Sequence, residues 1–295
     1  MRWAALVSLT AMLLAVSGCR ALGPFSPFRP LEQLLVYPQS VAPFSPFYED
    51  AGGQPVWINS GTNDRIDARY FAHPNPQAVV LYCHGNVGTV DKWAILVGRL
   101  SKLHRVSILV FDYRGYGRSS GIAHERAVFE DAQAARNWLA NENGIHPSDV
   151  VLMGRSLGGA VAVDLAANGG ARGLILESTF SSLPDVARQH VPLLFPDWNM
   201  TQRMNSVEKI RNYQGPVFQS HGDTDRLIPL ALGKELYAAA PGPKRFVIVP
   251  DATHNDDHIR DCAVEREQFL RNLPPPMSQT VMLPPREFIL TSYHE

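Results

Sequence analysis

The sequence has little of three features that would assign it to a specialised class. Only three cysteines occur in 295 residues, at positions 19, 83 and 262, which leaves almost no material for a disulfide-based fold. Basic and acidic residues nearly cancel, 27 against 28, and the basic ones form no stripe, so nucleic-acid binding has no support. No apolar run is long enough to cross a bilayer as a helix. The length instead suits one large α/β domain with a full hydrophobic core.

Two of the cysteines fall inside this predicted domain. Cys83 lies in a predicted strand and Cys262 in the predicted C-terminal helix. They could pair in an oxidising compartment, but the sequence alone cannot place them within bonding distance. We interpret both as buried free thiols.

The first 18 residues have the composition of a targeting signal. Met1 and Arg2 supply positive charge, and an apolar stretch from Trp3 to Val16 follows. This stretch is too short for a spanning helix and is typical of a signal-peptide core. It ends in Val16-Ser17-Gly18-Cys19, which resembles the bacterial lipobox. The resemblance implies a signal peptide over residues 1–18, lipidation of Cys19 and anchoring to a membrane surface of the bacterial cell envelope. A plain secretory signal with a chance cysteine is the alternative.

Composition divides the rest of the chain into three parts. Residues 19–54 are rich in proline and phenylalanine and are interpreted as a tether, with a short ordered piece near Leu31–Tyr37, and residues 274–295 as an extended proline-rich tail. Residues 55–273 alternate strands with helices, which predicts a mostly parallel sheet with helices on both faces. The predicted strands are Val56–Asn59, Ile66–Phe71, Ala78–Cys83, Val106–Phe111, Val150–Met153, Gly173–Leu176, Val217–Gln219 and Phe246–Val249. The predicted helices are Val90–Leu103, Glu125–Glu142, Ser156–Ala167, Leu230–Ala239 and Asp256–Asn272.

The strongest chemical signal is Gly154-Arg155-Ser156-Leu157-Gly158, which follows an apolar strand and leads into a helix of small residues. The pattern is that of a nucleophile elbow, a sharp turn that lifts a serine Oγ over a helix N-terminus. Glycines at both ends leave room for a backbone that a Cβ would block, and the serine is usually held in strained φ and ψ. Ser156 is therefore the candidate nucleophile. A glycine-rich turn that happens to contain a serine is the alternative.

A nucleophilic serine needs a base and an acid that orients the base, and in this architecture they follow in the order Ser, Asp or Glu, His. His254 lies on a loop after the last predicted strand, where open α/β sheets place their sites. The preceding turn offers two carboxylates, Asp223 and Asp225. Asp223 stands at the start of the turn, where a carboxylate commonly accepts a local backbone N–H. We therefore favour Asp225, which comes later in the turn, as the acid.

Backbone N–H groups can stabilise the oxyanion that such a reaction forms. One is expected at the N-terminus of the helix after Ser156, from Leu157. The loop after the Ala78–Cys83 strand contains glycine and can turn the N–H of Asn86 toward the serine. The two N–H groups form the predicted oxyanion hole, although an ordinary Asn/Gly turn would also explain the loop.

Five segments of the chain occur in the order LYCHGNVG (81–88), FDYRGYGRSSG (111–121), GRSLGGA (154–160), ESTF (177–180) and HGDTDRLIP (221–229). Together they resemble the α/β-hydrolase superfamily, and more closely its Bem46-like and ABHD13/ABHD17-like serine hydrolases. The resemblance covers the chain from about Val56 to Leu273 and implies an eight-stranded α/β-hydrolase fold. It also implies Ser156 as nucleophile, Asp225 as acid and His254 as base. Cys83 and Ala252 depart from the common pattern without removing a catalytic group.

Residues 181–205 interrupt the alternation of strands and helices, and in this family the segment forms a cap over the site. It is short, which predicts a small lid and an open acyl pocket. Apolar side chains of this segment are the candidates for the pocket wall, with packing against the sheet as the alternative: Leu193, Leu194, Phe195 and Trp198.

These observations favour a serine hydrolase that cleaves an acyl ester or thioester of a small substrate through a covalent acyl-enzyme. A serine aminopeptidase of the same fold is an alternative, although no acidic pocket for a substrate amine is evident. A catalytically silent binding lipoprotein is another. No metal or other cofactor is implied, since Asp256, Asp257 and His258 are explained more simply as the acidic first turn of the last helix.

Overall fold

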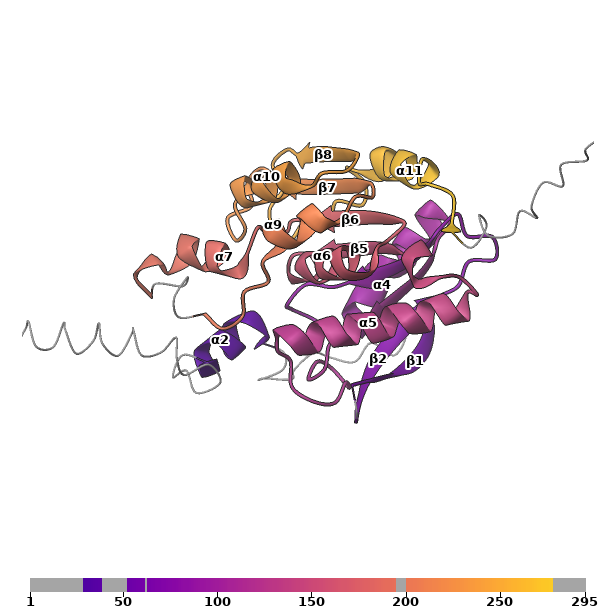
Figure 1. Cartoon of the computed structure of the whole chain (residues 1–295), viewed down its shortest axis with the longest axis horizontal. Helices are drawn as coiled ribbons and strands as arrows, with labels where there is room; N and C mark the ends of the chain where they lie inside the picture. The colour runs from indigo at the N-terminus through magenta and orange to yellow at the C-terminus, as the bar shows by residue number, and fades with distance from the viewer. Residues whose placement is uncertain (1–28, 39–51, 62, 195–199, 278–295) are drawn as a thin grey trace, which may run out of the picture.

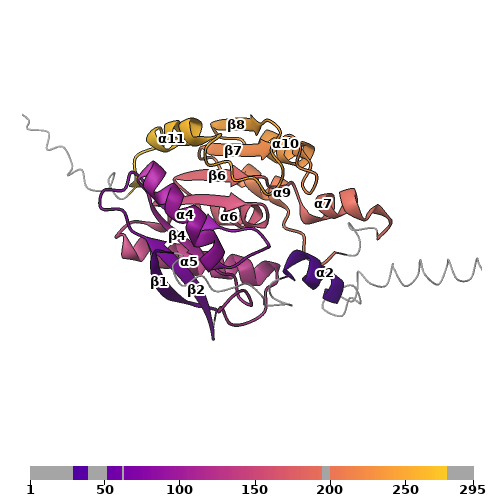
Figure 2. The ribbon, with the colours of Figure 1, turned by 180° about the vertical axis from the view of Figure 1, so that it is seen from behind.

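The chain folds as a sheet between two layers of helices (Figure 1). The structure, a computed structural model, describes residues 29–38, 52–61, 63–194 and 200–277. Helices α5 (Glu125–Glu142) and α6 (Leu157–Gly169) lie in front of the sheet in Figure 1. Helix α4 (Val90–His104) covers the opposite face and lies in front when the molecule is seen from behind in Figure 2. The predicted arrangement of helices on both faces of one sheet is confirmed.

The sheet has eight strands in the order β1-β2-β4-β3-β5-β6-β7-β8. The β1–β2 and β2–β4 pairs are antiparallel, and all other pairs are parallel, as predicted. The carboxyl ends of the parallel strands therefore meet at one edge, which is where sites form in such sheets. The strands are β1 Gln54–Ser60, β2 Asp64–Phe71, β3 Val79–Cys83, β4 Ser107–Phe111, β5 Val151–Arg155, β6 Gly173–Glu177, β7 Val217–Gly222 and β8 Lys244–Val249.

Two hydrophobic cores, one on each face, explain why the central strands are apolar except at their ends. Successive side chains of a strand point to opposite faces. In β5, Leu152 packs into the core under α5, α6 and α10 (Leu230–Ala239), whereas Val151 and Met153 pack into the core under α4 and α11 (Ala263–Arg271). Every residue of β3, β4, β5 and β6 is buried. Strands covered on both faces have no polar positions to alternate with, so their sequences are continuous apolar runs.

The last helix differs from its prediction. It begins at Ala263 rather than at Asp256, and residues 256–262 are irregular. The Asp256 carboxylate accepts hydrogen bonds from the N–H and Oγ1 of Thr253 at 2.7 and 2.8 Å, and His258 is buried with Nδ1 2.9 Å from Ser220 Oγ. The tertiary contact of His258 with Ser220, together with the local hydrogen bonds between Thr253 and Asp256, holds the segment in a non-helical path. The interpretation of Asp256, Asp257 and His258 as a first helical turn is therefore wrong.

In its described residues, the segment predicted as a cap contains helix α7 (Leu183–His190) and a 3-10 turn, η3 (Pro192–Leu194). Ser182 caps α7, since its Oγ accepts the N–H of Asp185 at 3.2 Å. In Figure 1, α7 extends away from the sheet on the side where the α2 helix also lies. Further along the chain, the short helix α9 (Ser206–Lys209) and the turn η4 (Ile210–Asn212) lead back to β7.

Part of the predicted tether is helical and attached to the domain. Helix α2 spans Arg29–Val36, over the piece expected to be ordered. The Glu32 carboxylate accepts hydrogen bonds from Thr201 Oγ1 and the Gln202 N–H, both at 2.6 Å, where the chain returns from the cap segment. None of the helices in the described ranges is long and apolar enough to cross a membrane. The predicted signal peptide and Cys19 lie outside the described residues.

Candidate active site

Ser156 lies at the sharp turn between β5 and α6. Its φ of 54° and ψ of −120° are a strained combination for a residue with a Cβ. A Cβ on Gly154 would overlap the backbone of Gly158, and a Cβ on Gly158 would overlap the carbonyls of Cys83 and His84 at the end of β3. Both predicted glycines are therefore required by close contacts. The turn is also bonded to the end of β6 and the segment after it, because the Ser156 N–H donates to the Glu177 carbonyl at 2.9 Å and Thr179 Oγ1 donates to the Ser156 carbonyl at 2.8 Å.

The structure brings Ser156, His254 and Asp225 together in a hydrogen-bonded chain. His254 Nε2 lies 3.1 Å from Ser156 Oγ, and His254 Nδ1 lies 2.8 Å from Asp225 Oδ2. The three residues follow β5, β8 and β7, so they meet at the carboxyl edge of the sheet. A proton on Nδ1 satisfies the carboxylate, which leaves the Nε2 lone pair facing the serine hydroxyl. The His254 side chain is 13% exposed and the Asp225 side chain 0%, so solvent reaches the imidazole but not the acid.

The environment of Asp225 favours its ionised form. Its Oδ1 accepts the N–H groups of Leu227 and Ile228 at 2.9 and 2.8 Å. Burial alone would raise the pKa of Asp225, but hydrogen bonds from His221, His254 and the Ile228 N–H outweigh it and hold the pKa well below the usual range. His221 Nε2 lies 3.4 Å from Asp225 Oδ2 and 2.8 Å from the Ile228 carbonyl. His221 therefore shapes the turn that holds Asp225.

Asp223, the other carboxylate of this turn, faces a different partner. Its Oδ1 accepts the N–H of Asp251 at 2.7 Å, across the sheet rather than within its own turn. The prediction that Asp223 accepts a backbone N–H of its own turn is therefore wrong. The cause is the parallel pairing of β7 with β8, which aligns Gly222 with Val249 and places the loops that follow side by side. Asp223 is exposed and holds the loop that carries His254, and among the described residues it forms no hydrogen bond with His254.

The loop after β3 lies against the nucleophile. A Cβ built on Gly85 would be 3.5 Å from Ser156 Cβ, so the following residue, Asn86, is at the edge of the site. Within the described part of the chain, the N–H groups of Asn86 and Leu157 have no hydrogen-bond acceptor. Tyr116 Oη donates to the Asn86 carbonyl at 3.2 Å, which fixes this peptide of the loop. The predicted oxyanion donors are thus unpaired groups on two elements that meet at Ser156.

The residues predicted to line an acyl pocket are only partly described. Leu193 lies on η3, with 84% of its surface exposed. Leu194 closes the same turn, but its side chain is not among those described, and Phe195 and Trp198 lie outside the described residues. The pocket wall stays a prediction.

Buried ionic residues behind the site escaped the sequence analysis. Arg266 of α11 donates from Nη2 to Glu177 Oε1 at 2.6 Å and to the His258 carbonyl at 3.1 Å. Glu177 is the last residue of β6, and both charged side chains are almost completely buried. The pair ties the base of the His254 loop to the sheet. The one sequence signal for this ion pair is the charge of Glu177 at the end of an apolar strand. Its partner could not be predicted, because Arg266 is far away in the chain.

The two cysteines of the domain are free and buried, as predicted. Burial raises the pKa of the Cys262 thiol to about 11 and also raises the pKa of Cys83. Both thiols are therefore protonated near neutral pH and are poor nucleophiles.

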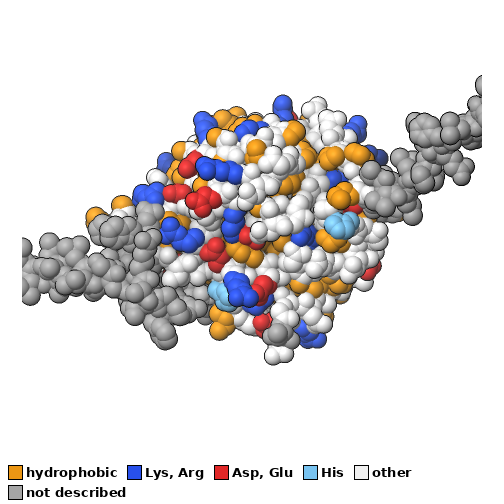
Figure 3. All heavy atoms as spheres, viewed as in Figure 1, with side chains coloured by type: hydrophobic (Ala, Val, Ile, Leu, Met, Phe, Trp, Pro, Cys, Tyr) orange, Lys and Arg blue, Asp and Glu red, His pale blue; other side chains and the backbone are white. Residues whose placement is uncertain are grey.

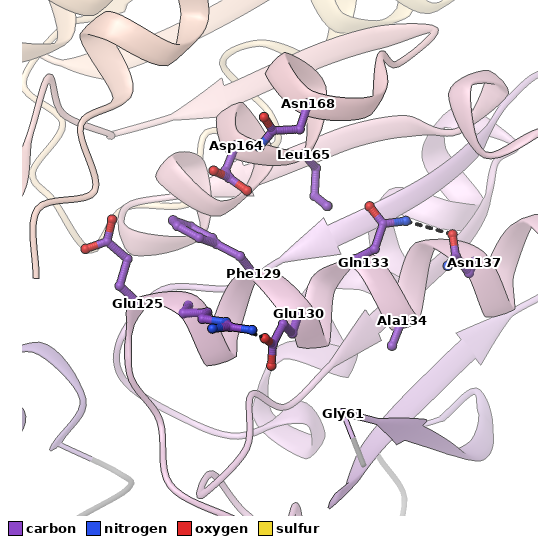
Figure 4. Close-up of a pocket in the computed structure, with 11 residues that line it drawn as sticks. Gly61, Glu125, Phe129, Glu130, Gln133, Ala134, Asn137, Asp164, Leu165 and Asn168 are labelled. Carbon is purple, nitrogen blue, oxygen red and sulfur yellow. Dashed lines mark hydrogen bonds and ion pairs between the residues drawn. The ribbon is translucent and has the colours of Figure 1, made fainter.

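A groove of about 680 Å³ lies elsewhere, between α5 and α6 (Figure 4). Phe129 and Leu165 form part of its apolar lining, and Glu125, Glu130 and Asp164 lie around it. None of its lining residues belongs to the Ser156–His254–Asp225 chain. On the face seen in Figure 3, acidic and basic side chains are interspersed.

Comparisons with known proteins agree with this architecture. A sequence model described as the alpha/beta hydrolase fold matches residues 78–208. An uncharacterized protein of Mycobacterium tuberculosis is 36% identical over 223 residues, which cover 75% of this chain and 79% of that protein. The uncharacterized protein YfhR of Escherichia coli is 33% identical over 204 residues, covering 66% of this chain and 70% of YfhR. The chain belongs to the α/β-hydrolase superfamily.

Solved structures share the fold at low sequence identity. An alpha-beta hydrolase from Vibrio vulnificus superposes with a TM-score of 0.66 and 21% identity, covering 84% of this chain and 95% of that one. An esterase from Pyrococcus furiosus gives a TM-score of 0.63 and 16% identity, with 78% and 97% covered. Est1E from Butyrivibrio proteoclasticus, solved with bound ferulic acid, gives a TM-score of 0.62 and 18% identity, covering 74% of this chain and 98% of that one.

The low pKa of Asp225 predicts a specific acid sensitivity. Because the folded pKa lies below the unfolded value of about 3.9, Asp225 stabilises the fold fully above that pH, and this stabilisation is lost as the pH falls. Wild type should lose more unfolding free energy between about pH 6 and pH 3 than Asp225→Asn, which cannot titrate there. Urea unfolding at both pH values measures the difference, and the remaining carboxylates are common to both proteins. Equal losses would contradict the assignment.

Proposed function

We propose that the protein is a serine hydrolase that cleaves an acyl ester or thioester. The observation that carries this proposal is the hydrogen-bonded chain from Ser156 through His254 to Asp225, beside two unpaired N–H groups. The fold family and the esterases among its structural neighbours support the same class of reaction. We also assign the chain to the Bem46-like subgroup on its five sequence segments.

The proposed chemistry proceeds in two halves. Ser156 Oγ attacks the acyl carbon, its proton passes to His254 Nε2, and the carbonyl electron pair moves to the oxygen, which accepts the N–H groups of Asn86 and Leu157. The tetrahedral intermediate collapses and expels an alcohol or thiol, which takes the proton from Nε2. Water then repeats the sequence on the acyl-enzyme, releasing the acid and restoring Ser156. Asp225 stays ionised and stabilises the imidazolium that forms in each half.

Covalent labelling tests the nucleophile. A fluorophosphonate probe should label the wild type and should not label Ser156→Ala, because the probe is attacked by the activated serine oxygen. Ser178→Ala is the matched control: Ser178 also has a positive φ, 45°, at the end of the neighbouring strand, and it is completely buried. This control should label like the wild type. Full labelling of Ser156→Ala would show that the assignment is wrong.

The two carboxylates of the turn after β7 provide a second test. Asp225→Asn should lose turnover by a factor on the order of 10⁴, as the same substitution does in serine proteases, because an amide favours the wrong tautomer of the base. Asp223→Asn should lose far less, since an asparagine oxygen can still accept the N–H of Asp251. The measurement is kcat on p-nitrophenyl acetate for variants with similar melting temperatures. A reversed order would make Asp223 the acid.

We also propose that the mature protein is anchored to the bacterial cell envelope through lipidated Cys19. The charged start, the apolar core and the Val-Ser-Gly-Cys order support this proposal. Wild type expressed in bacteria should enter the detergent phase of a Triton partition, and Cys19→Ser should leave it. Cys83→Ser, which removes a buried thiol of the domain, is the control and should partition like the wild type. Unchanged partitioning of Cys19→Ser would count against the anchor.

A further inference from the structure

Arg155, the residue before the nucleophile, is a buried cation with unusual partners. Its surface is 5% exposed, and none of the ion pairs among the described residues includes it. Instead, Nη2 donates to the carbonyl of His254 at 2.6 Å and to the carbonyl of Asp256 at 2.8 Å. Both acceptors are backbone atoms of the loop that carries the proposed base.

This loop depends on side chains for its position, because it has no regular secondary structure from β8 to α11. Its first part is tied to the turn after β7, where Asp223 accepts the N–H of Asp251 and Thr224 Oγ1 donates to the Ala252 carbonyl at 2.8 Å. Beyond Ala252, the carbonyls of His254 and Asp256 accept from no other donor among the described residues. Arg155 therefore holds the part of the loop from which the imidazole projects.

The same guanidinium also borders the third loop of the site. Its Cζ lies 5.9 Å from the ring centre of Trp93, and Trp93 Nε1 donates to the Val87 carbonyl at 3.0 Å. Val87 follows Asn86, whose N–H is the proposed oxyanion donor. One side chain thus links the turn of the nucleophile with the loop of the base, and through Trp93 it lies against the loop of the oxyanion donor.

We propose that Arg155 is a positioning residue that sets the distance between His254 Nε2 and Ser156 Oγ; this inference rests on the proposed roles of those two residues. Arg155 is joined to Ser156 by one peptide bond, so its hydrogen bonds place the main chain of the base relative to the main chain of the nucleophile. A planar guanidinium can direct two N–H bonds from one nitrogen into two carbonyls in fixed directions, which a lysine ammonium does less well. A misplacement of about 1 Å is enough to cost about 10²-fold in rate.

The chain offers a matched control in Arg136 of α5. It is 4% exposed, and its Nη1 donates to the backbone carbonyls of Leu165 and Gly170 at 3.3 and 3.0 Å, away from the site. Arg155→Met and Arg136→Met should both lower the melting temperature. Only Arg155→Met should lower kcat on p-nitrophenyl acetate, by about 10²-fold with KM within about twofold, and Arg155→Lys should fall between it and the wild type.

A readout without activity separates this inference from the proposed reaction. The Thr253 N–H donates to Asp256 Oδ2 at 2.7 Å. Its rate of exchange with solvent should be higher in Arg155→Met than in the wild type and should be unchanged in Arg136→Met. The downfield proton resonance of the His254–Asp225 hydrogen bond should be lost or broadened in the first variant alone. Both measurements remain valid if Ser156→Ala shows that Ser156 is not the nucleophile.

Three outcomes would overturn the proposal. They are a kcat of Arg155→Met within twofold of the wild type, equal losses of kcat in the two methionine variants, and loop exchange that does not change. If Arg155→Met does not fold, Arg155→Lys takes its place in each comparison, and a wild-type kcat with wild-type exchange at Thr253 then overturns the proposal.

Discussion

The close approach of helix α6 to the end of strand β3 is the constraint on which the site depends. Gly158 leaves no room for a Cβ against the carbonyls of Cys83 and His84, so the first turn of α6 rests directly on the backbone. This contact brings Gly85 next to Ser156 and places the N–H groups of Asn86 and Leu157 at the same edge. A larger residue would separate the two halves of the proposed oxyanion hole by displacing the helix. The strained φ of Ser156 is a consequence of the same tight turn.

Buried ionisable groups lie behind two loops of the site, and their energetics indicate a positional role. An intact buried ion pair adds little net stability, because desolvation offsets the attraction, but removing one partner costs about 3–5 kcal/mol. The Glu177–Arg266 pair under the His254 loop is of this kind. Under the oxyanion loop, Asp112 Oδ1 lies 3.3 Å from His84 Nε2 and accepts the Val90 N–H at 2.6 Å, while burial raises the pKa of Asp112. Such groups are costly to rearrange, so each holds its loop in one conformation.

The parts of the fold that the sequence predicted are those governed by local rules. Strands buried on both faces are apolar along most of their length, so their number and their mostly parallel arrangement could be predicted from the chain. The elbow could be recognised because its Gly-x-Ser-x-Gly pattern is contiguous in the sequence, although only the contact that requires Gly154 is local and the one that requires Gly158 comes from the end of β3. The start of α11 could not be predicted, because His258 forms a buried contact with Ser220 and is not part of the helix. The partner of Asp223 was missed for the same reason: it belongs to a neighbouring strand end.

The loop that carries His254 shows why such contacts could not be predicted from sequence patterns. A loop without helix or strand has no periodicity, so its position is set by individual side chains that reach its backbone from elsewhere. Arg155 donates its hydrogen bonds there to carbonyls rather than to a carboxylate, and this difference has an electrostatic consequence. A carboxylate opposite Arg155 would place a second negative charge beside the imidazole and compete with Asp225 for its proton. Neutral carbonyl acceptors order the loop without that competition, so the Nδ1 of His254 is left to the one buried, ionised carboxylate that it meets at 2.8 Å.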